Sequence, residues 1–420
     1  MARSLYGHPD FMKLWMGQTI SVFGAQFSPV AIQYASQKIL NAGALQFGIL
    51  YAMGTLPFLI FGLPVGVWAD RYRRRRTMIY ANVGRALILL SVPLAYLTGY
   101  LSIEEFYVVA FSTGVLTVFF EICYQSYLPT IVERSELVDA NSKLQTSQAS
   151  ASGVGPALAG ALIAVVSAPL AILGDVVGYF SSAGFLSSIR KPESVLPKES
   201  RGSALTNIRE GLSIVAKDPR LRSIAGCTAT ANLFFSAYFA ILVPFEVLSF
   251  GFGSIEVGLV YASQGIGGIL GALVSKSIPK RIGVGRTILL GSALFTAPAI
   301  GLYFASGANA LAVLMAVFGT VGFAGVVYNV SQVSFRQALV SINLQGRINA
   351  TNRTIVWGTI PAGGIIGGVL ADALGYRTAV GIAAAFGVLA VVWILMSPVR
   401  RIGEIPSAPE IDSQEGAPGA

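Results

Sequence analysis

Apolar stretches of about twenty residues recur along the whole chain, separated by short polar segments. A helix needs about 20 mostly apolar residues to cross the hydrocarbon core of a bilayer. The pattern predicts twelve transmembrane spans, at residues 14–37, 46–68, 77–99, 105–127, 143–167, 170–189, 222–249, 255–275, 286–306, 309–331, 347–371 and 376–397. The first and fifth spans are the most polar, and polar residues inside a span are typical of helices that face a wet interior.

The composition agrees with a membrane protein. Hydrophobic residues make up 54% of the 420 residues and charged residues only 12%, whereas charged residues approach about 25% in soluble domains. The 47 glycines are consistent with close helix packing in a bilayer. The first apolar stretch is long and lacks a small-residue cleavage site, so we expect it to remain as the first span.

The charges predict the orientation in the membrane. If the N-terminus is cytoplasmic, 25 lysines and arginines fall in cytoplasmic segments and 2 in external ones. Because cytoplasmic loops are enriched in positive charge, both termini are predicted inside, in a multi-pass protein of the inner membrane. This distribution also accounts for the net charge of +9 without a nucleic-acid partner.

The chain divides into two halves of six spans. We predict an N-terminal half at 1–189, a cytoplasmic linker at 190–221, a C-terminal half at 222–399 and a disordered tail at 400–420. The linker contains an amphipathic stretch, Ala204 to Lys217, expected at the cytoplasmic membrane face. Pro156 and Pro361 stand in similar glycine-rich segments of the fifth and eleventh spans. Two repeated halves favour a substrate cavity near the middle of the membrane.

A glycine, an acid and a group of arginines follow the second span. Gly66, Asp70, Arg71, Arg75 and Arg76 resemble the loop signature of the major facilitator superfamily, Gly-x-x-x-Asp-Arg-x-Gly-x-Arg-Arg, with an arginine in place of the second glycine. The resemblance implies a loop that controls conformational change. The alternative is a basic cluster that only sets topology.

Two further segments narrow the resemblance. Gly155, Pro156 and Gly160 resemble the fifth-span packing motif of antiporters, although small-residue packing alone explains them equally well. The stretch from Phe119 to Asn141 is similar to the third drug:proton antiporter family, which includes macrolide-efflux proteins and the enterobactin exporter. This resemblance implies an all-α major facilitator fold with two pseudo-symmetric halves, and proton-driven export by alternating access.

Several ionisable or polar residues lie within the predicted spans, where they are costly and therefore candidates for function. Arg85 and Glu121 are expected at similar depth, which makes a pair possible; the pair either couples protons or only neutralises two charges. Asp175 is a third candidate for proton coupling. The candidates for lining the cavity, or for joining helices by hydrogen bonds, are Gln18, Gln26, Gln33, Gln148, Asn232 and Arg353.

Other functional classes find little support. The sequence contains no zinc-ligand spacing, nucleophile elbow or phosphate loop, so we predict no enzyme, no metal and no cofactor besides a proton gradient. The predicted partners are a small-molecule substrate, protons and the bilayer, and the protein is expected to act as a monomer. Lipid flipping or metabolite uptake on the same fold is the alternative, followed by a sensor that does not transport.

Overall fold

The structure is a computed structural model in which residues 5–62, 64–65, 73–133, 136–191 and 204–404 are described. Within these ranges the chain is helical apart from short connections. Ten helical segments are long and apolar enough to cross a membrane, and the pair Pro219–Ala240 and Leu242–Phe250, bent by 44°, adds an eleventh if it forms one span. The all-α membrane architecture is therefore confirmed, while the number twelve stays a prediction.

Contacts divide the chain into two compact units. Unit 1 comprises residues 1–199 and 243–262, and unit 2 comprises residues 200–242 and 263–420. The segment 243–262 lies in the predicted C-terminal half, so the compact units do not coincide with the two halves expected from the sequence.

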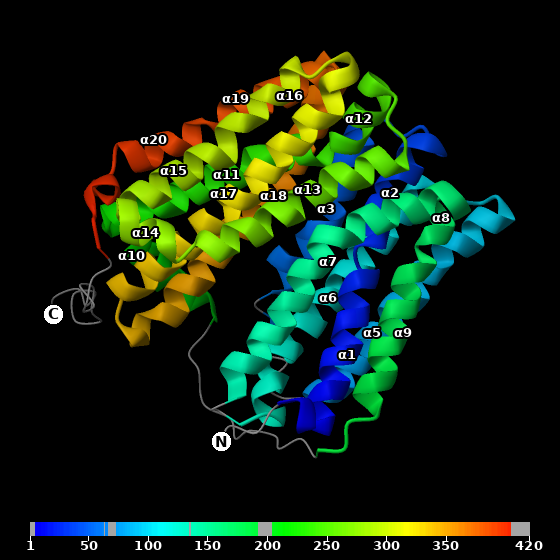
Figure 1. The fold of residues 1–420 in the computed structure, drawn as a ribbon, viewed down its shortest axis with the longest axis horizontal. Helices are drawn as coiled ribbons and strands as arrows, with labels where there is room; N and C mark the ends of the chain where they lie inside the picture. The colour runs from blue at the N-terminus through cyan, green and yellow to red at the C-terminus, as the bar shows by residue number, and fades with distance from the viewer. Residues whose placement is uncertain (1–4, 63, 66–72, 134–135, 192–203, 405–420) are drawn as a thin grey trace. The chain divides into compact units, whose positions relative to one another are not determined.

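Unit 1 is built around α1, α5 and α9, which run alongside one another (Figure 1). In addition, α7 packs on α1, and α6 packs on α3 and α5. The elements are η1 (Leu5–Gly7), α1 (Pro9–Gly24), α2 (Phe27–Lys38), α3 (Ala44–Phe61), α5 (Arg74–Thr98), α6 (Ile103–Ile131), α7 (Leu137–Val166), α8 (Ala168–Ala171), α9 (Leu173–Ser187), α12 (Leu242–Phe250) and the first part of α13 (Ser254–Val274).

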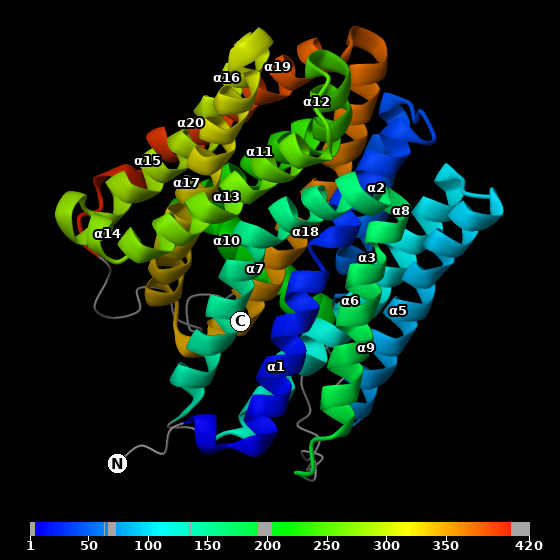
Figure 2. The same ribbon diagram turned by 45° about the vertical axis from the view of Figure 1, so that its right-hand side comes forward.

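Unit 2 is organised by α11, which packs against α18, α19 and α20, while α15 packs against α17 (Figure 2). The elements besides the rest of α13 are α10 (Ala204–Lys217), α11 (Pro219–Ala240), α14 (Ser277–Ile282), α15 (Val284–Thr296), η3 (Ala297–Ile300), α16 (Gly301–Phe304), η4 (Gly307–Asn309), α17 (Ala310–Leu339), α18 (Ile342–Leu374), α19 (Tyr376–Gly387), α20 (Leu389–Leu395) and η5 (Pro398–Arg401). The amphipathic helix α10 has the predicted bounds, and one of its faces packs on α18.

Prolines explain two breaks that the hydropathy pattern hides. A proline lacks the N–H that would bond the carbonyl four residues earlier, and its ring crowds that carbonyl. Pro29 cannot donate a hydrogen bond to the Ala25 carbonyl, and α1 ends just before Ala25 while α2 begins two residues after it. The predicted first span is therefore two short helices. Pro244 acts on Ala240, the last residue of α11, and α12 follows at an angle.

Small residues bring α7 close to its neighbours in unit 1. A methyl group at position 155 would overlap the side chain of Gln26, and one at position 160 would overlap the carbonyl of Ser254. The Ser254 hydroxyl donates a hydrogen bond to the Gly160 carbonyl at 2.8 Å. The structure therefore places the Gly155-Pro156-Gly160 segment at tight helix contacts.

The first residues of the predicted C-terminal tail belong to the folded part of unit 2. Arg400 and Arg401 belong to η5, and the carbonyls of Ile402 and Gly403 accept hydrogen bonds from the backbone N–H groups of Gly285 and Val284 at 2.9 and 3.0 Å. These bonds satisfy N–H groups at the start of α15 that have no partner within the helix. Residues 405–420 lie outside the described part of the chain.

Candidate functional site

A cavity of about 660 Å³ opens within unit 1, a volume in the range of drug-sized ligand sites. It brings together three of the four predicted glutamines with Arg85 and Glu121. The fourth, Gln33, instead accepts a hydrogen bond from the Tyr261 hydroxyl at 3.4 Å. The polar and aromatic wall consists of Gln18, Ser21, Gln26, Arg85, Thr117, Phe120, Glu121, Tyr124, Gln125, Asn141, Gln145, Gln148 and Tyr179.

Arg85 is the most enclosed charge on this wall, at 4% exposure. Its guanidinium carbon lies 4.6 Å from the ring centroid of Phe120 and 4.1 Å from that of Tyr179. Each such cation–π contact is worth about 0.5–2 kcal/mol depending on desolvation. The two rings fix the guanidinium and supply part of the stabilisation that water would give to its charge.

Hydrogen bonds complete the environment of Arg85. Nη1 donates to the Thr117 hydroxyl at 3.3 Å, and Nη2 donates to the Asn82 amide oxygen. Asn82 is one helical turn from Arg85, on the same face of α5, and its own amide donates to Ser182 at 2.9 Å. Nε has no hydrogen-bond partner in the described part of the chain, which leaves one buried donor beside the cavity.

Glu121 lies on the same wall with its side chain exposed. It takes part in further polar or electrostatic interactions, and the Tyr179 hydroxyl lies in the field of both Glu121 and Arg85. The guanidinium of Arg85 contacts Asn82, Thr117 and the two rings. The structure thus brings Arg85 and Glu121 to one cavity, and their direct pairing stays a prediction.

Asp175 lies behind this wall rather than on it. It is 2% exposed, in the first turn of α9, where the helix dipole favours a negative charge. Ser28 of α2 donates its hydroxyl to Oδ2 at 2.5 Å, while Oδ1 has no partner among the described residues. Arg85 lies within electrostatic reach. Asp175 is therefore a buried acid close enough to Arg85 for the two charges to interact.

Unit 2 holds a second cavity, of about 720 Å³. Asn232 and Arg353, two predicted cavity residues, lie on its wall, together with Trp357. Its described lining contains amides and arginines but no aspartate or glutamate. The polar lining residues include Thr228, Asn232, Gln264, Asn329, Gln332, Arg336, Asn349, Asn352 and Arg353.

Arg336 was missed as a cavity residue. The sequence places it in a cytoplasmic loop, since the predicted span ends at 331, but α17 continues to Leu339. The side chain is 8% exposed and donates to Gln332 Oε1 at 3.2 Å and to Asn349 Oδ1 at 3.1 Å. The amphipathic spacing of Gln332 and Arg336, four residues apart, is the signal that indicates a helix here.

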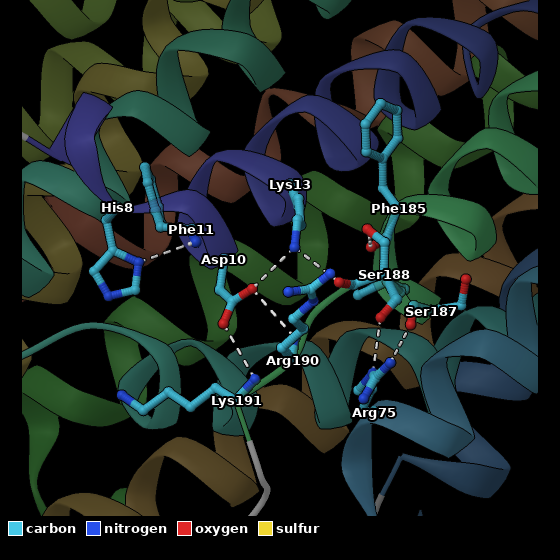
Figure 3. Close-up of polar contacts among 11 residues, drawn as sticks. His8, Asp10, Phe11, Lys13, Arg75, Phe185, Ser187, Ser188, Arg190 and Lys191 are labelled. Carbon is cyan, nitrogen blue, oxygen red and sulfur yellow. Dashed lines mark hydrogen bonds and ion pairs between the residues drawn. The ribbon is translucent and has the colours of Figure 1, made fainter.

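The predicted gating loop is only partly described: Gly66, Asp70 and Arg71 lie outside the described residues. Arg75 donates from Nε to the Leu186 carbonyl at 2.7 Å and from Nη2 to the Ser187 carbonyl. Lys13 donates to the Ser188 carbonyl at 2.8 Å (Figure 3). Two cations thereby cap the last carbonyls of α9, which a helix leaves unpaired. Arg76 is exposed.

Asp10 links Lys13 to the backbone of Arg190 and Lys191, which follow α9 in the chain. Its carboxylate accepts from Lys13 Nζ at 3.3 Å and from the backbone N–H groups of Arg190 and Lys191 at 3.2 and 3.1 Å (Figure 3). Burial opposes its ionisation, but these hydrogen bonds outweigh it, so the pKa of Asp10 lies below its usual 3.8. The cluster, named here the α9 cap, consists of Asp10, Lys13, Arg75, Arg190 and Lys191.

The family model described as transmembrane secretion effector, of the major facilitator superfamily, matches residues 4–415. The chain belongs to this family. The resemblance to the major facilitator superfamily and its third drug:proton antiporter family is thereby confirmed, and the protein is a multi-pass protein of the inner membrane.

Alignments with known proteins cover most of the chain. The multidrug efflux pump Tap of Mycolicibacterium fortuitum is 27% identical over 380 residues, covering 86% of this chain and 90% of Tap. The enterobactin exporter EntS of Escherichia coli O157:H7 is 24% identical over 416 residues, covering 97% of this chain and 96% of EntS. A crystal structure of the nucleoside transporter NupG superposes with a TM-score of 0.69 at 13% identity, covering 92% of this chain and 98% of NupG, which shows the shared fold.

Proposed function

We propose that this transporter exports a drug-like or siderophore-like small molecule by alternating access, and that protons moving down their gradient drive the export. The observation that carries the proposal is the wall of the unit 1 cavity. There a buried arginine, Arg85, lies between two aromatic rings, with Glu121 on the same wall and Asp175 behind it. Ionisable residues inside a membrane protein typically mark substrate or proton paths.

The cavity walls favour a substrate rich in oxygen and aromatic surface. Amide side chains in both cavities offer donors and acceptors, while Phe120, Tyr179 and Trp357 offer apolar faces. A neutral or weakly acidic compound suits walls that carry Arg85, Arg336 and Arg353 better than a multiply charged cation does. The relatives that export drugs or enterobactin support the same substrate class.

Drug accumulation in an efflux-deficient bacterial host tests the proposal. Cells that express the chain are expected to accumulate less erythromycin or less enterobactin than cells with an empty vector. A protonophore should remove the difference because it collapses the proton gradient. Equal accumulation of every compound in the two strains contradicts export, and export that resists the protonophore contradicts proton coupling.

Glu121→Gln tests whether this acid takes part in coupling. Loss of the charge should abolish protonophore-sensitive export while the purified variant still folds and binds substrate. Glu104→Gln is the matched control, because Glu104 is an exposed acid on the first turn of the same helix, α6. Unchanged proton-dependent export in Glu121→Gln assigns Glu121 a structural role.

A further inference from the structure

One carboxyl group in unit 1 is enclosed more completely than any candidate in the cavity. Glu246, on α12, is 0% exposed. Residues 241–247 around it are all buried, with Leu242, Val243 and Phe245 each at 0% exposure. The sequence hides this residue because it is a single acid near the predicted outer end of an apolar span, where snorkelling to water is expected.

Both carboxyl oxygens of Glu246 are without a hydrogen-bond partner in the described part of the chain. Tyr261, a phenol on α13, interacts electrostatically with Glu246 and also with Tyr51 on α3. Tyr261 directs its hydroxyl to Gln33 on α2, at 3.4 Å. Among the described residues, no lysine, arginine or histidine forms an ion pair with Glu246.

A carboxylate in these surroundings is shielded from water and receives neither a cation nor a hydrogen-bond donor from the described residues. Burying an ionised group in this way is strongly unfavourable, and the group neutralises instead. If the side chain stayed neutral at all times, glutamine or leucine would fill the position at a lower free-energy cost, because neither has an ionisable group to desolvate. A carboxyl group at this position is explained if a second conformation of the alternating-access cycle exposes it to water.

We propose that Glu246 is a proton-binding site of the transport cycle. When its surroundings open to water, the carboxylate accepts a proton from hydronium, which becomes water. The resulting carboxylic acid is uncharged and can be enclosed as it is here. Reopening returns the proton to water and the charge to Glu246. Its place in the cycle rests on the proposed proton-coupled export, and the proton site is distinct from Arg85, Glu121 and Asp175.

Infrared spectroscopy tests the protonation directly. The full chain is reconstituted in vesicles of phosphatidylethanolamine and phosphatidylglycerol, and spectra of Glu246→Gln are subtracted from those of the unaltered chain. A carbonyl band of a protonated carboxyl is expected at neutral pH and should disappear at alkaline pH. Absence of the band at neutral pH, or its persistence at every pH, overturns the proposal.

Transport of radiolabelled erythromycin into inside-out vesicles tests the role in coupling. Glu246→Gln should reduce gradient-driven uptake at least about tenfold and leave substrate exchange without a gradient within about twofold. Glu256→Gln is the control. Glu256 lies in the first turn of α13, the helix that follows α12, and it accepts a hydrogen bond from the Gly253 N–H at 2.9 Å. This variant should retain both activities. Gradient-driven uptake of normal rate in Glu246→Gln overturns the proposal.

If Glu246→Gln also loses substrate exchange, misfolding of the variant explains the loss equally well, and transport by Glu246→Asp, which keeps a carboxyl group, then tests the proton site. Restored gradient-driven uptake with a shifted pH optimum supports the proton site, and failure of this variant overturns it. If the unaltered chain shows no gradient-driven uptake, the proposed function fails, while the infrared band still decides whether Glu246 binds a proton.

Discussion

The two units each enclose a cavity of similar size, but the charges on the two walls differ. In unit 1, Arg85 lies between two aromatic rings, with Glu121 on the wall and Asp175 behind it. In unit 2, Arg336 is held by the amide oxygens of Gln332 and Asn349, and the described lining carries no acid.

This difference separates two kinds of chemistry. A carboxyl group near an arginine can gain or lose a proton, and its charge state then changes the field around the cavity. Arginines held by amides stay charged at any physiological pH, so they can bind a substrate but cannot pass on a proton. Under the proposed function, we therefore expect proton chemistry in unit 1 and permanent substrate recognition in unit 2.

The largest expected effect is on Arg85. Arg85→Ala removes two ring contacts and the hydrogen bonds to Thr117 and Asn82, and it leaves two acids without their nearby cation. Export should fall about tenfold to a hundredfold, which corresponds to about 1.4–2.7 kcal/mol of lost transition-state stabilisation. Arg85→Lys should remain impaired, because an ammonium cannot reproduce the planar contacts. Full export by Arg85→Lys contradicts a role for the guanidinium geometry.

Tight helix packing is expected to be common to both units, unlike the charge chemistry. A methyl group at Gly160 would overlap the Ser254 carbonyl in unit 1, and one at Gly363 would overlap the Leu233 carbonyl in unit 2. Each Gly→Ala change should destabilise the protein by about 1–3 kcal/mol, measured as a lower melting temperature in detergent.

Gly184→Ala is the matched control for these two variants. Nothing lies within 4 Å of a methyl group there, and alanine is favoured over glycine inside a helix by about 0.5–1 kcal/mol. This variant should be equally or more stable. Destabilisation of all three by the same amount refutes the assignment of Gly160 and Gly363 to close contacts.

Arg353 tests the assignment of recognition to unit 2. Arg353→Gln keeps a hydrogen-bonding side chain on the wall and removes the charge. We expect the KM for export to rise about threefold to tenfold, because glutamine replaces a charged hydrogen bond with a neutral one at a net loss of about 1 kcal/mol, with the pH profile of export unchanged. A shifted pH profile would place proton chemistry in unit 2 and remove the contrast between the cavities.

The smallest effects concern the predicted cytoplasmic ends of the units. Asp10→Asn weakens the α9 cap of unit 1, and Glu210→Gln removes an exposed ion pair of unit 2, in which Glu210 lies 2.7 Å from Arg347 with side chains 45% and 42% exposed. Asp10→Asn should cost about 1 kcal/mol at neutral pH, whereas the exposed pair is worth about 0–1 kcal/mol.

The pH dependence tests how Asp10 stabilises unit 1. Because the folded-state pKa of Asp10 is lowered, its stabilisation is present above about pH 4 and disappears as the pH falls through the folded-state pKa. Melting temperatures of Asp10→Asn and the unaltered chain should therefore converge in acid. A difference that persists at low pH shows that Asp10 acts through packing rather than charge.

Several features could be read from the chain in advance. The spans that contain Arg85, Glu121 and Gln148 could be predicted from hydropathy, because each is one long continuous helix whose apolar residues follow one another along the chain. The structure places Gln18, Gln26 and Gln148 with Arg85 on one cavity wall, and their functional roles stay predictions. Arg336 and Glu246 were overlooked because a charge near a span end is normally solvated.

The sequence by itself determined the membrane environment, the apolar spans and the family, because each depends on composition or on a continuous motif. The tertiary structure alone decided which polar residues meet: Ser28 with Asp175, Arg85 with Phe120 and Tyr179, and Glu246 with no partner among the described residues. Such meetings depend on the rotation and kink of helices far apart in sequence, and on burial on every side, which hydropathy along one helix does not contain.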